Sequence, residues 1–180
     1  MKKMTLCGVI VFCVVLTGCG RHQFHMQTMA RDFKAERPAL VHDAGPVALK
    51  NGATEAPGTE QIVCSIRRLD VNTSVYDFTN SAIGSAKSAF QAVHVAVDDT
   101  AAKTLEFTIP TVRCDTGWRF SFGMTLRVKT GSGVIREYQG SEPVATVYQA
   151  AAAEELSILQ CIEQMLNDKE IAAYLGSTGK

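Results

Sequence analysis

The sequence predicts an α+β fold: a two-layer domain in which an antiparallel sheet of about four strands carries two helices on one face, preceded by a flexible tether. Three observations lead to this prediction. Segments of alternating apolar and polar residues follow one another between residues 60 and 140, the last third of the chain carries a helical apolar stripe, and residues 20–59 have no sustained period. The folded domain is therefore expected to span residues 60–176.

Four segments have the alternation of half-buried strands. They are QIVCSIRRL (61–69), KTLEFTIPTVRC (103–114), WRFSFGMTLRVK (118–129) and VIREYQG (134–140). In the second segment Pro110 interrupts the alternation and the apolar parity changes after it, which predicts a bulge or an edge strand. Residues 130–133 (TGSG) predict a hairpin between the last two strands.

Two helical stretches flank these strands. Candidate N-caps over residues 77–81 precede an apolar stripe of Ile83, Ala86, Phe90 and Val93. A second stripe, apolar except at Glu155, consists of Val144, Val147, Tyr148, Ala151, Glu155, Ile158, Ile162 and Met165. The segment DKEIAAYLG adds one or two further turns, which end at Gly176.

The first residues of the chain have the pattern of an export signal. Two lysines at positions 2 and 3 precede an apolar run over residues 6–16, which is too short to span a bilayer because a spanning helix needs roughly 20 apolar residues. LTGC at residues 16–19 resembles the lipobox of bacterial lipoproteins. This resemblance implies that residues 1–18 are a signal peptide, removed before Cys19, and that diacylglycerol on the Cys19 thiol anchors the protein to the membrane. An ordinary signal peptide is the alternative.

Residues 19–59 are interpreted as the lipidated cysteine and a flexible tether. A flexible segment of about 40 residues has an end-to-end distance near 35 Å, enough to hold the domain away from the membrane. The apolar runs 39–41 and 46–49 allow an edge strand or a hairpin within it. Gly20 follows Cys19 where an aspartate would resemble an inner-membrane retention signal, so the sequence favours the periplasmic face of the outer membrane. His22, His25 and His42 are expected to be solvated rather than to bind metal.

Charge and cysteine content limit the function classes. Without Lys2 and Lys3 the chain keeps two fewer basic than acidic residues and has no basic block, so no nucleic-acid partner is expected. Cys64, Cys114 and Cys161 remain after cleavage, and their spacing matches no zinc or haem pattern. Two interpretations of these three cysteines are open: one disulfide with one free thiol, or three free cysteines that are buried as small side chains.

The sequence contains no recognised catalytic motif, and neither an enzymatic activity nor a cofactor is expected. His94 is the only histidine within residues 60–176 and is interpreted as structural, although a hydrolase would have to use it. Asp98 and Asp99 are interpreted as a solvated loop rather than a cation site. The aromatic ladder of Trp118, Phe120 and Phe122 fits core packing better than a ligand groove.

A row of basic residues on the strands is the candidate interaction face. It consists of Arg119, Arg127, Lys129 and Arg136. If these side chains share the open face of the sheet, an acidic partner or glycan could bind there, whereas ordinary solvated strand charge is the alternative.

The C-terminal half resembles the YajG-type bacterial lipoproteins in the order of its elements and in short motifs. Arg136, Tyr138 and Gly140 match an Arg-x-Tyr-x-Gly strand ending, and Asp168, Ile171 and Leu175 match the terminal helix. The resemblance implies an outer-membrane lipoprotein without catalysis. We therefore expect a non-catalytic interaction module that serves an envelope protein partner, with a small-ligand or lipid-binding lipoprotein as the alternative.

Overall fold

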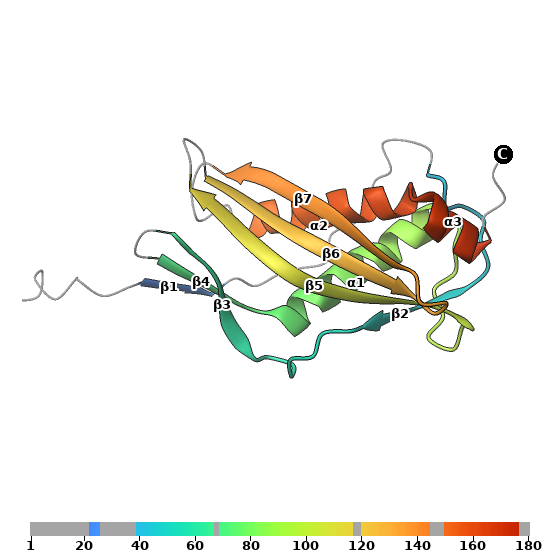
Figure 1. Cartoon of the computed structure of the whole chain (residues 1–180), viewed down its shortest axis with the longest axis horizontal. Helices are drawn as coiled ribbons and strands as arrows, with labels where there is room; N and C mark the ends of the chain where they lie inside the picture. Colours follow the sequence, from blue (N-terminus) through green and yellow to red (C-terminus); the bar gives the residue numbers. More distant parts are fainter. Residues whose placement is uncertain (1–21, 26–38, 67–68, 117–119, 145–149, 177–180) are drawn as a thin grey trace, which may run out of the picture.

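The computed structural model describes residues 22–25, 39–66, 69–116, 120–144 and 150–176 (Figure 1). The elements in chain order are β1 (His22–His25), β2 (Val47–Asn51), β3 (Glu60–Ile66), β4 (Leu69–Ser74), α1 (Val75–Ala92), β5 (Lys103–Thr116), β6 (Phe120–Thr130), β7 (Ile135–Val144), α2 (Ala150–Leu166) and α3 (Lys169–Leu175). The predicted α+β class is confirmed.

The larger sheet has four strands in the order β2-β5-β6-β7. β5, β6 and β7 form the predicted antiparallel meander, and the register shift between Thr108 and Thr111 is the predicted bulge at Pro110. The fourth strand is β2, which pairs with β5 in parallel, so the prediction of an all-antiparallel sheet is wrong at this edge. Parallel neighbours need a crossover connection, and α1 lies within that connection.

A second sheet has the order β1-β4-β3 and contains the strand predicted at residues 61–69. Its central strand, β4, was not predicted because Asp70 and Asn72 have low strand propensity and Thr73 is polar. These polar residues are nevertheless buried, and Ser65 Oγ donates a 2.6 Å hydrogen bond to Asp70 Oδ1. The polar central strand is thus stabilised by hydrogen bonds rather than by apolar packing alone.

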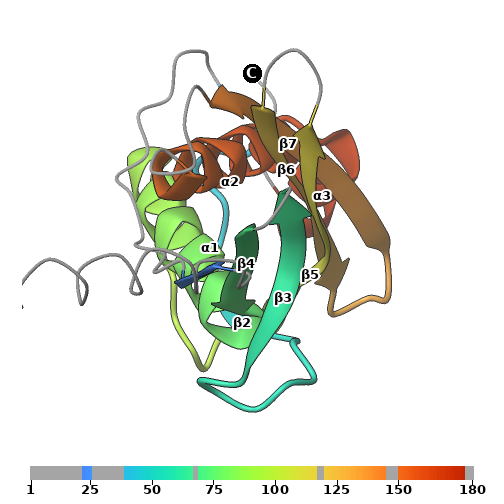
Figure 2. The same ribbon diagram turned by 90° about the vertical axis from the view of Figure 1, so that its left-hand side faces the viewer.

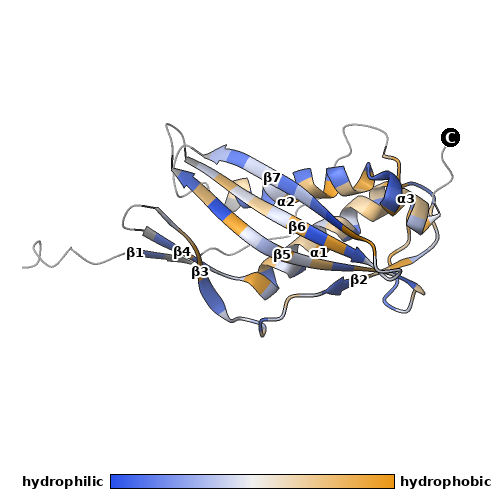
Figure 3. Cartoon of the chain, in the orientation of Figure 1, coloured by the Kyte–Doolittle hydropathy of each residue, from blue (hydrophilic) through white to orange (hydrophobic). Residues whose placement is uncertain are grey.

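Helices α1 and α2 cover one face of the larger sheet, as predicted (Figures 1 and 2). Figure 3 shows the alternation of hydrophobic and hydrophilic residues along β5 and β6. The largest fully buried side chains come from both layers: Phe78, Phe90, Leu105, Phe107, Phe122, Met124, Leu126, Ile158, Ile162, Met165, Leu166 and Ile171. Each such side chain contributes roughly 1.5–3 kcal/mol of burial free energy. No helix within the described ranges has the length and apolarity needed to cross a membrane.

The helix ends are set by local hydrogen bonds. Ser74, earlier than the caps predicted at residues 77–81, caps α1 by accepting from the Asp77 amide at 3.2 Å. Gly176 ends α3 in the left-handed conformation, as its position predicts. The predicted stripe on α2 is confirmed at Ile158, Ile162 and Met165, which are completely buried. Its predicted start is wrong, because Val144 ends β7, and Glu154 rather than the partly exposed Glu155 is fully buried.

The domain begins before residue 60, so the predicted boundary and the flexible tether over residues 39–59 are corrected. Val41 and Val47 are completely buried and belong to the main core, because β2 completes the sheet beside β5. The apolar run 46–49 thus supplies an edge strand, one of the outcomes the sequence allows, whereas the run 39–41 lies outside any strand. β1 also joins a sheet, and the remainder of the expected tether, residues 20–21 and 26–38, lies outside the described residues.

Candidate functional site

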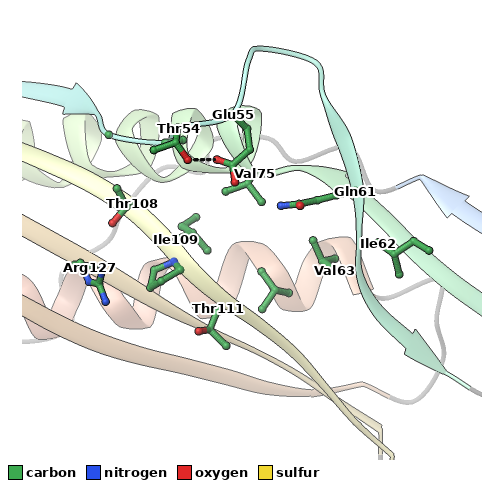
Figure 4. Close-up of a pocket in the computed structure, with 14 residues that line it drawn as sticks. Thr54, Glu55, Gln61, Ile62, Val63, Val75, Thr108, Ile109, Thr111 and Arg127 are labelled. Atoms are coloured by element: carbon green, nitrogen blue, oxygen red, sulfur yellow. Dashed lines mark hydrogen bonds between the residues drawn. The ribbon is translucent and has the colours of Figure 1, made fainter.

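A groove of about 520 Å³ lies between β3 and β5, where the edges of the two sheets face each other (Figure 4). Its apolar floor contains Val75 and Ile109, and its rim is mostly polar. The lining residues are Gly52, Ala53, Thr54, Glu55, Gln61, Ile62, Val63, Val75, Thr108, Ile109, Pro110, Thr111, Val112 and Arg127. The groove is open to solvent along one side rather than enclosed.

The groove exists because β2 leaves β5 early. The last contact along that edge is a 2.8 Å hydrogen bond from the Gly52 amide to the Phe107 carbonyl. A Cβ at Gly52 would lie 2.7 Å from Cγ of Glu106, so any other residue here would require the Glu106 side chain to move. Asn51 then turns the chain. Its side-chain Oδ1 accepts a hydrogen bond from the Ala53 backbone amide, and its side-chain Nδ2 donates one to the Tyr76 carbonyl. Beyond Phe107, the β5 edge has no strand partner among the described residues.

A disulfide closes one end of the groove. Cys64 on β3 and Cys114 on β5 are bonded, with their Cα atoms 5.7 Å apart, so the two strands meet there. The third cysteine, Cys161, is free and buried, and burial raises the pKa of its thiol to about 12. The structure therefore selects the disulfide with one free thiol from the two readings that the sequence left open.

The groove is suited to binding through packing and hydrogen bonds. Ile62 has 55% of its surface exposed, which is unusual for a large apolar side chain, and Figure 4 shows its side chain on the other side of β3 from Gln61 and Val63. The two ionisable lining residues are Glu55, which accepts a 3.4 Å hydrogen bond from Thr54 Oγ1, and Arg127. The lining contains no histidine, cysteine or serine, and its hydroxyl groups belong to Thr54, Thr108 and Thr111.

The predicted basic row does not form one face. Register pairs Arg127 with Glu137 and Val128 with Arg136, so Arg136 points toward the helix layer while Arg127 and Lys129 point away from it. Arg127 is also neutralised, because its Nη2 lies 2.7 Å from Glu137 Oε1. Arg119 lies outside the described residues. The idea of a shared basic surface that includes Arg136 is therefore wrong.

Arg136 instead belongs to a polar cluster that joins β7 to the start of α3. Asp168 Oδ2 accepts from Arg136 Nε at 2.8 Å and from the Tyr138 hydroxyl at 3.0 Å, and Asp168 Oδ1 caps α3 through the Glu170 amide. Burial alone would raise the pKa of Asp168, but the hydrogen bonds from Arg136, the Glu170 amide and Tyr138 lower it below its usual value. Burial raises the pKa of Tyr138, and Asp168 adds to this effect.

The residues of the C-terminal motif meet in space and have structural roles. Gly140 allows β7 to pack against α2, because a Cβ there would lie 2.1 Å from the Ser157 carbonyl oxygen. Ile171 and Leu175 are completely buried under the sheet. Together with Arg136, Tyr138 and Asp168, they fix the C-terminal helices onto β7.

The remaining candidates lie apart from the groove. His94 is exposed and follows α1 with a positive φ of 59°. Asp98 accepts hydrogen bonds from the amide and hydroxyl of Thr100, both at 2.8 Å, as expected of a polar loop. Phe122 packs in the core with its ring centroid 6.3 Å from that of Phe78, which agrees with the core interpretation. Trp118 lies outside the described residues.

Two features of the structure could not be predicted from the sequence. The groove depends on two sheet edges that are far apart in the chain, and the only local signal for it was the bulge at Pro110. Glu154 is the second: it is completely buried, and neither carboxylate oxygen has a hydrogen-bond partner. The only feature of the sequence that could have indicated this burial is the position of Glu154, one residue before Glu155 in a strongly apolar helix.

Comparisons with known proteins identify the fold but not a family. No family model matches the chain, and no curated protein matches it in sequence. The fold is similar to that of protein XCC0632 from Xanthomonas campestris, described under the family model DUF330, with a TM-score of 0.51 and 13% identity over 84% of this chain and 95% of that chain. The YajG-type resemblance thus stays a prediction.

Two other structures are similar at a lower level. A minor lipoprotein from Acinetobacter baumannii has a TM-score of 0.42 and 14% identity over 71% of this chain and 92% of its own. PelC from Paraburkholderia phytofirmans, solved as a dodecamer, has a TM-score of 0.40 and 18% identity over 73% and 94%. These values are too low to carry an argument about function.

Proposed function

We propose that the protein is a lipid-anchored, non-catalytic interaction module on the periplasmic face of the outer membrane, and that it binds an envelope protein in the groove between β3 and β5. The observation that carries this proposal is the groove itself, which is open and polar at its rim but has an apolar floor, together with the exposed Ile62 on the adjoining face of β3. Such a surface suits contact with another polypeptide, in which apolar anchors are surrounded by polar contacts. The lipobox at residues 16–19 supports the anchor and the location.

Site-specific photocrosslinking in cells tests the groove. A photoreactive p-benzoylphenylalanine replaces Gln61 at the rim, and in a second strain it replaces Ile135 in the hairpin between β6 and β7. We expect one envelope protein to crosslink reproducibly at position 61 and not at position 135. Absence of a protein crosslink at position 61 above the level at position 135 would refute the groove as the partner site.

A matched pair of substitutions identifies what the partner recognises. Ile62 and Ile135 have nearly equal exposed fractions, 55% and 56%, so replacing either by aspartate costs little stability. Ile62→Asp is expected to abolish the crosslink, whereas Ile135→Asp should leave it unchanged. Loss with both variants would indicate a general effect of surface charge instead of a specific groove contact.

The anchor is tested separately by Cys19→Ala. This variant lacks the thiol that would carry the lipid, so it is expected to leave the membrane fraction and to retain the far-ultraviolet circular dichroism of the folded domain. A Cys19→Ala protein that still sediments fully with outer membranes would contradict the anchor.

A small-ligand or lipid-binding function is the second candidate, because the groove volume lies within the usual range of about 300–1,000 Å³ for ligand sites. Its solvent-open side favours a protein partner instead. Lipid extraction and mass spectrometry of the purified protein distinguish the two: a stoichiometric lipid that disappears in Ile62→Asp would favour the carrier. Absence of catalysis is part of the proposal, and His94→Ala is expected to leave envelope phenotypes intact.

A further inference from the structure

We propose that the end of the domain where β3 leads into β4 lies against the membrane surface, held there by β1 within a few residues of the lipid. This inference rests on the proposed anchor at Cys19. It replaces the idea of a domain that stands away from the membrane on a long tether.

The position of β1 is the first step. β1 pairs in parallel with β4, and the register places His22 beside Leu69 and His25 beside Asn72. Leu69 is also the partner of Ile66 across the β3–β4 hairpin. The chain therefore enters the three-stranded sheet at the hairpin end, which lies at one end of the long axis of the molecule, while the β6–β7 hairpin lies at the other (Figure 1).

The length of chain before β1 is the second step. Three peptide units separate Cys19 from His22, and a fully extended chain spans at most about 3.6 Å per residue, so the two Cα atoms lie within about 11 Å of each other. A lipid on Cys19 thus brings the start of β1 close to the headgroups. The long segment between β1 and Ala39 follows this strand and cannot act as a spacer between lipid and domain.

The rest of the domain is connected to this end by bonds that fix its orientation. β4 pairs with β3 on one side and continues directly into α1 at Val75. β3 is joined covalently to the larger sheet by the Cys64–Cys114 disulfide. Movement of the three-stranded sheet relative to the bilayer is therefore transmitted to the whole domain.

The described side chains exposed at this end are polar. The exposed described side chains near the hairpin end and the disulfide include Gln23, Ser65, Arg113 and Asp115, which carry one positive and one negative charge. The occupant of this surface is thus a phospholipid headgroup layer brought into contact by the anchor.

This orientation places the groove near the membrane. Gln61 lies five strand residues from Ile66, which corresponds to about 17 Å along β3. A partner that enters the groove must therefore reach it close to the bilayer.

Lipid quenching of site-specific fluorophores tests the orientation. A maleimide dye labels two single-cysteine variants in turn: Gln23→Cys on β1 and Ile135→Cys at the opposite hairpin. The introduced thiol reacts selectively, because Cys161 is buried and Cys64 and Cys114 are joined in a disulfide. The lipidated protein is placed in phosphatidylcholine vesicles that contain a headgroup-nitroxide lipid. Because β6 spans roughly 30 Å between the two ends, quenching at position 23 is expected to exceed that at position 135 at least about threefold.

A linker variant provides the control. A flexible Gly/Ser insert of about 12 residues between Gly20 and Arg21 has a root-mean-square length near 20 Å, so it should remove the quenching at position 23 while the protein still floats with the vesicles. Equal quenching at both positions, or no quenching at position 23 in protein that floats, would overturn the orientation and leave the anchor intact. Failure of the protein to float would instead refute the proposed anchor on which the inference rests.

Discussion

Replacing the buried Glu154 by glutamine is expected to remove much of the pH dependence of the stability of this protein. Glu154 lies in α2 with none of its surface exposed, and both carboxylate oxygens lack hydrogen-bond partners. Burial, and to a smaller extent the neighbouring charge of Glu155, raises its pKa to about 9 from 4.5. At neutral pH the folded protein therefore holds this carboxyl protonated, whereas the unfolded chain does not.

The sign and the size of the effect follow from proton linkage. Between pH 4.5 and about 9 the folded state binds one more proton than the unfolded state, so the free energy of unfolding falls as pH rises, by about 1.4 kcal/mol per pH unit. From pH 4.5 to pH 7.5 this amounts to about 4 kcal/mol, and the loss levels off above about pH 9, where the folded state also ionises. Glutamine has a similar shape but cannot ionise. The stability advantage of Glu154→Gln over the natural protein should grow from near zero to about 4 kcal/mol over the same range.

Urea unfolding followed by far-ultraviolet circular dichroism measures this advantage across the pH range. The matched control is Glu163→Gln, which changes a partly exposed glutamate on the same helix and should follow the natural protein at every pH. If Glu154→Gln and the natural protein respond to pH in parallel, Glu154 is ionised in the folded state and the reasoning from its burial is wrong.

Three further predictions concern the links between elements. The double variant Cys64→Ser, Cys114→Ser opens a loop that the disulfide closes over a sequence separation of 50. Its free energy of unfolding, measured in urea, should be about 4 kcal/mol lower than that of the natural protein. If a reductant destabilises the double variant as much as the natural protein, this effect does not come from the disulfide. Asp168→Asn weakens the contact with Arg136 and should cost about 1–3 kcal/mol. Because the pKa of Asp168 is lowered by folding, this cost is fully present above about pH 5 and shrinks as the pH falls below 3.8; a pH-independent gap in unfolding titrations would contradict it. His94→Gly should raise the melting temperature, because glycine adopts the positive φ found at this position at about 1 kcal/mol lower cost. His94→Ala should not raise it. Equal effects of the two substitutions would argue against backbone strain at His94.

Much of the fold was predictable because periodic burial leaves a local record in the chain. The alternation over β6 gave the buried residues Phe122, Met124, Leu126 and Val128 correctly, since successive strand side chains point to opposite faces. The parity change at Pro110 gave the bulge in β5 for the same reason. Such patterns depend on one element and its immediate environment.

Pairing between distant segments was not predictable in this way. β2 carries too few residues to show a period, and whether it joins β5 in parallel depends on the path of α1. Arg136 was grouped with Arg127 because both lie on strands, but the hairpin register decides the face of each side chain, and a shift of one residue exchanges the faces. The meeting of Arg136 and Tyr138 with Asp168 likewise requires β7 to lie beside the start of α3.

The sequence by itself determined the α+β class, the meander of β5 to β7, the existence of the helices and the expectation of a lipid anchor at Cys19, because these depend on local periodicity and on a contiguous motif. Only the tertiary structure decided that Cys64 pairs with Cys114, that a groove opens between two sheet edges, that Glu154 is buried without a partner and that β1 joins the domain three residues after Cys19. Each of these depends on which segments become neighbours in space, and that choice is made by the packing of the whole core rather than by any one segment.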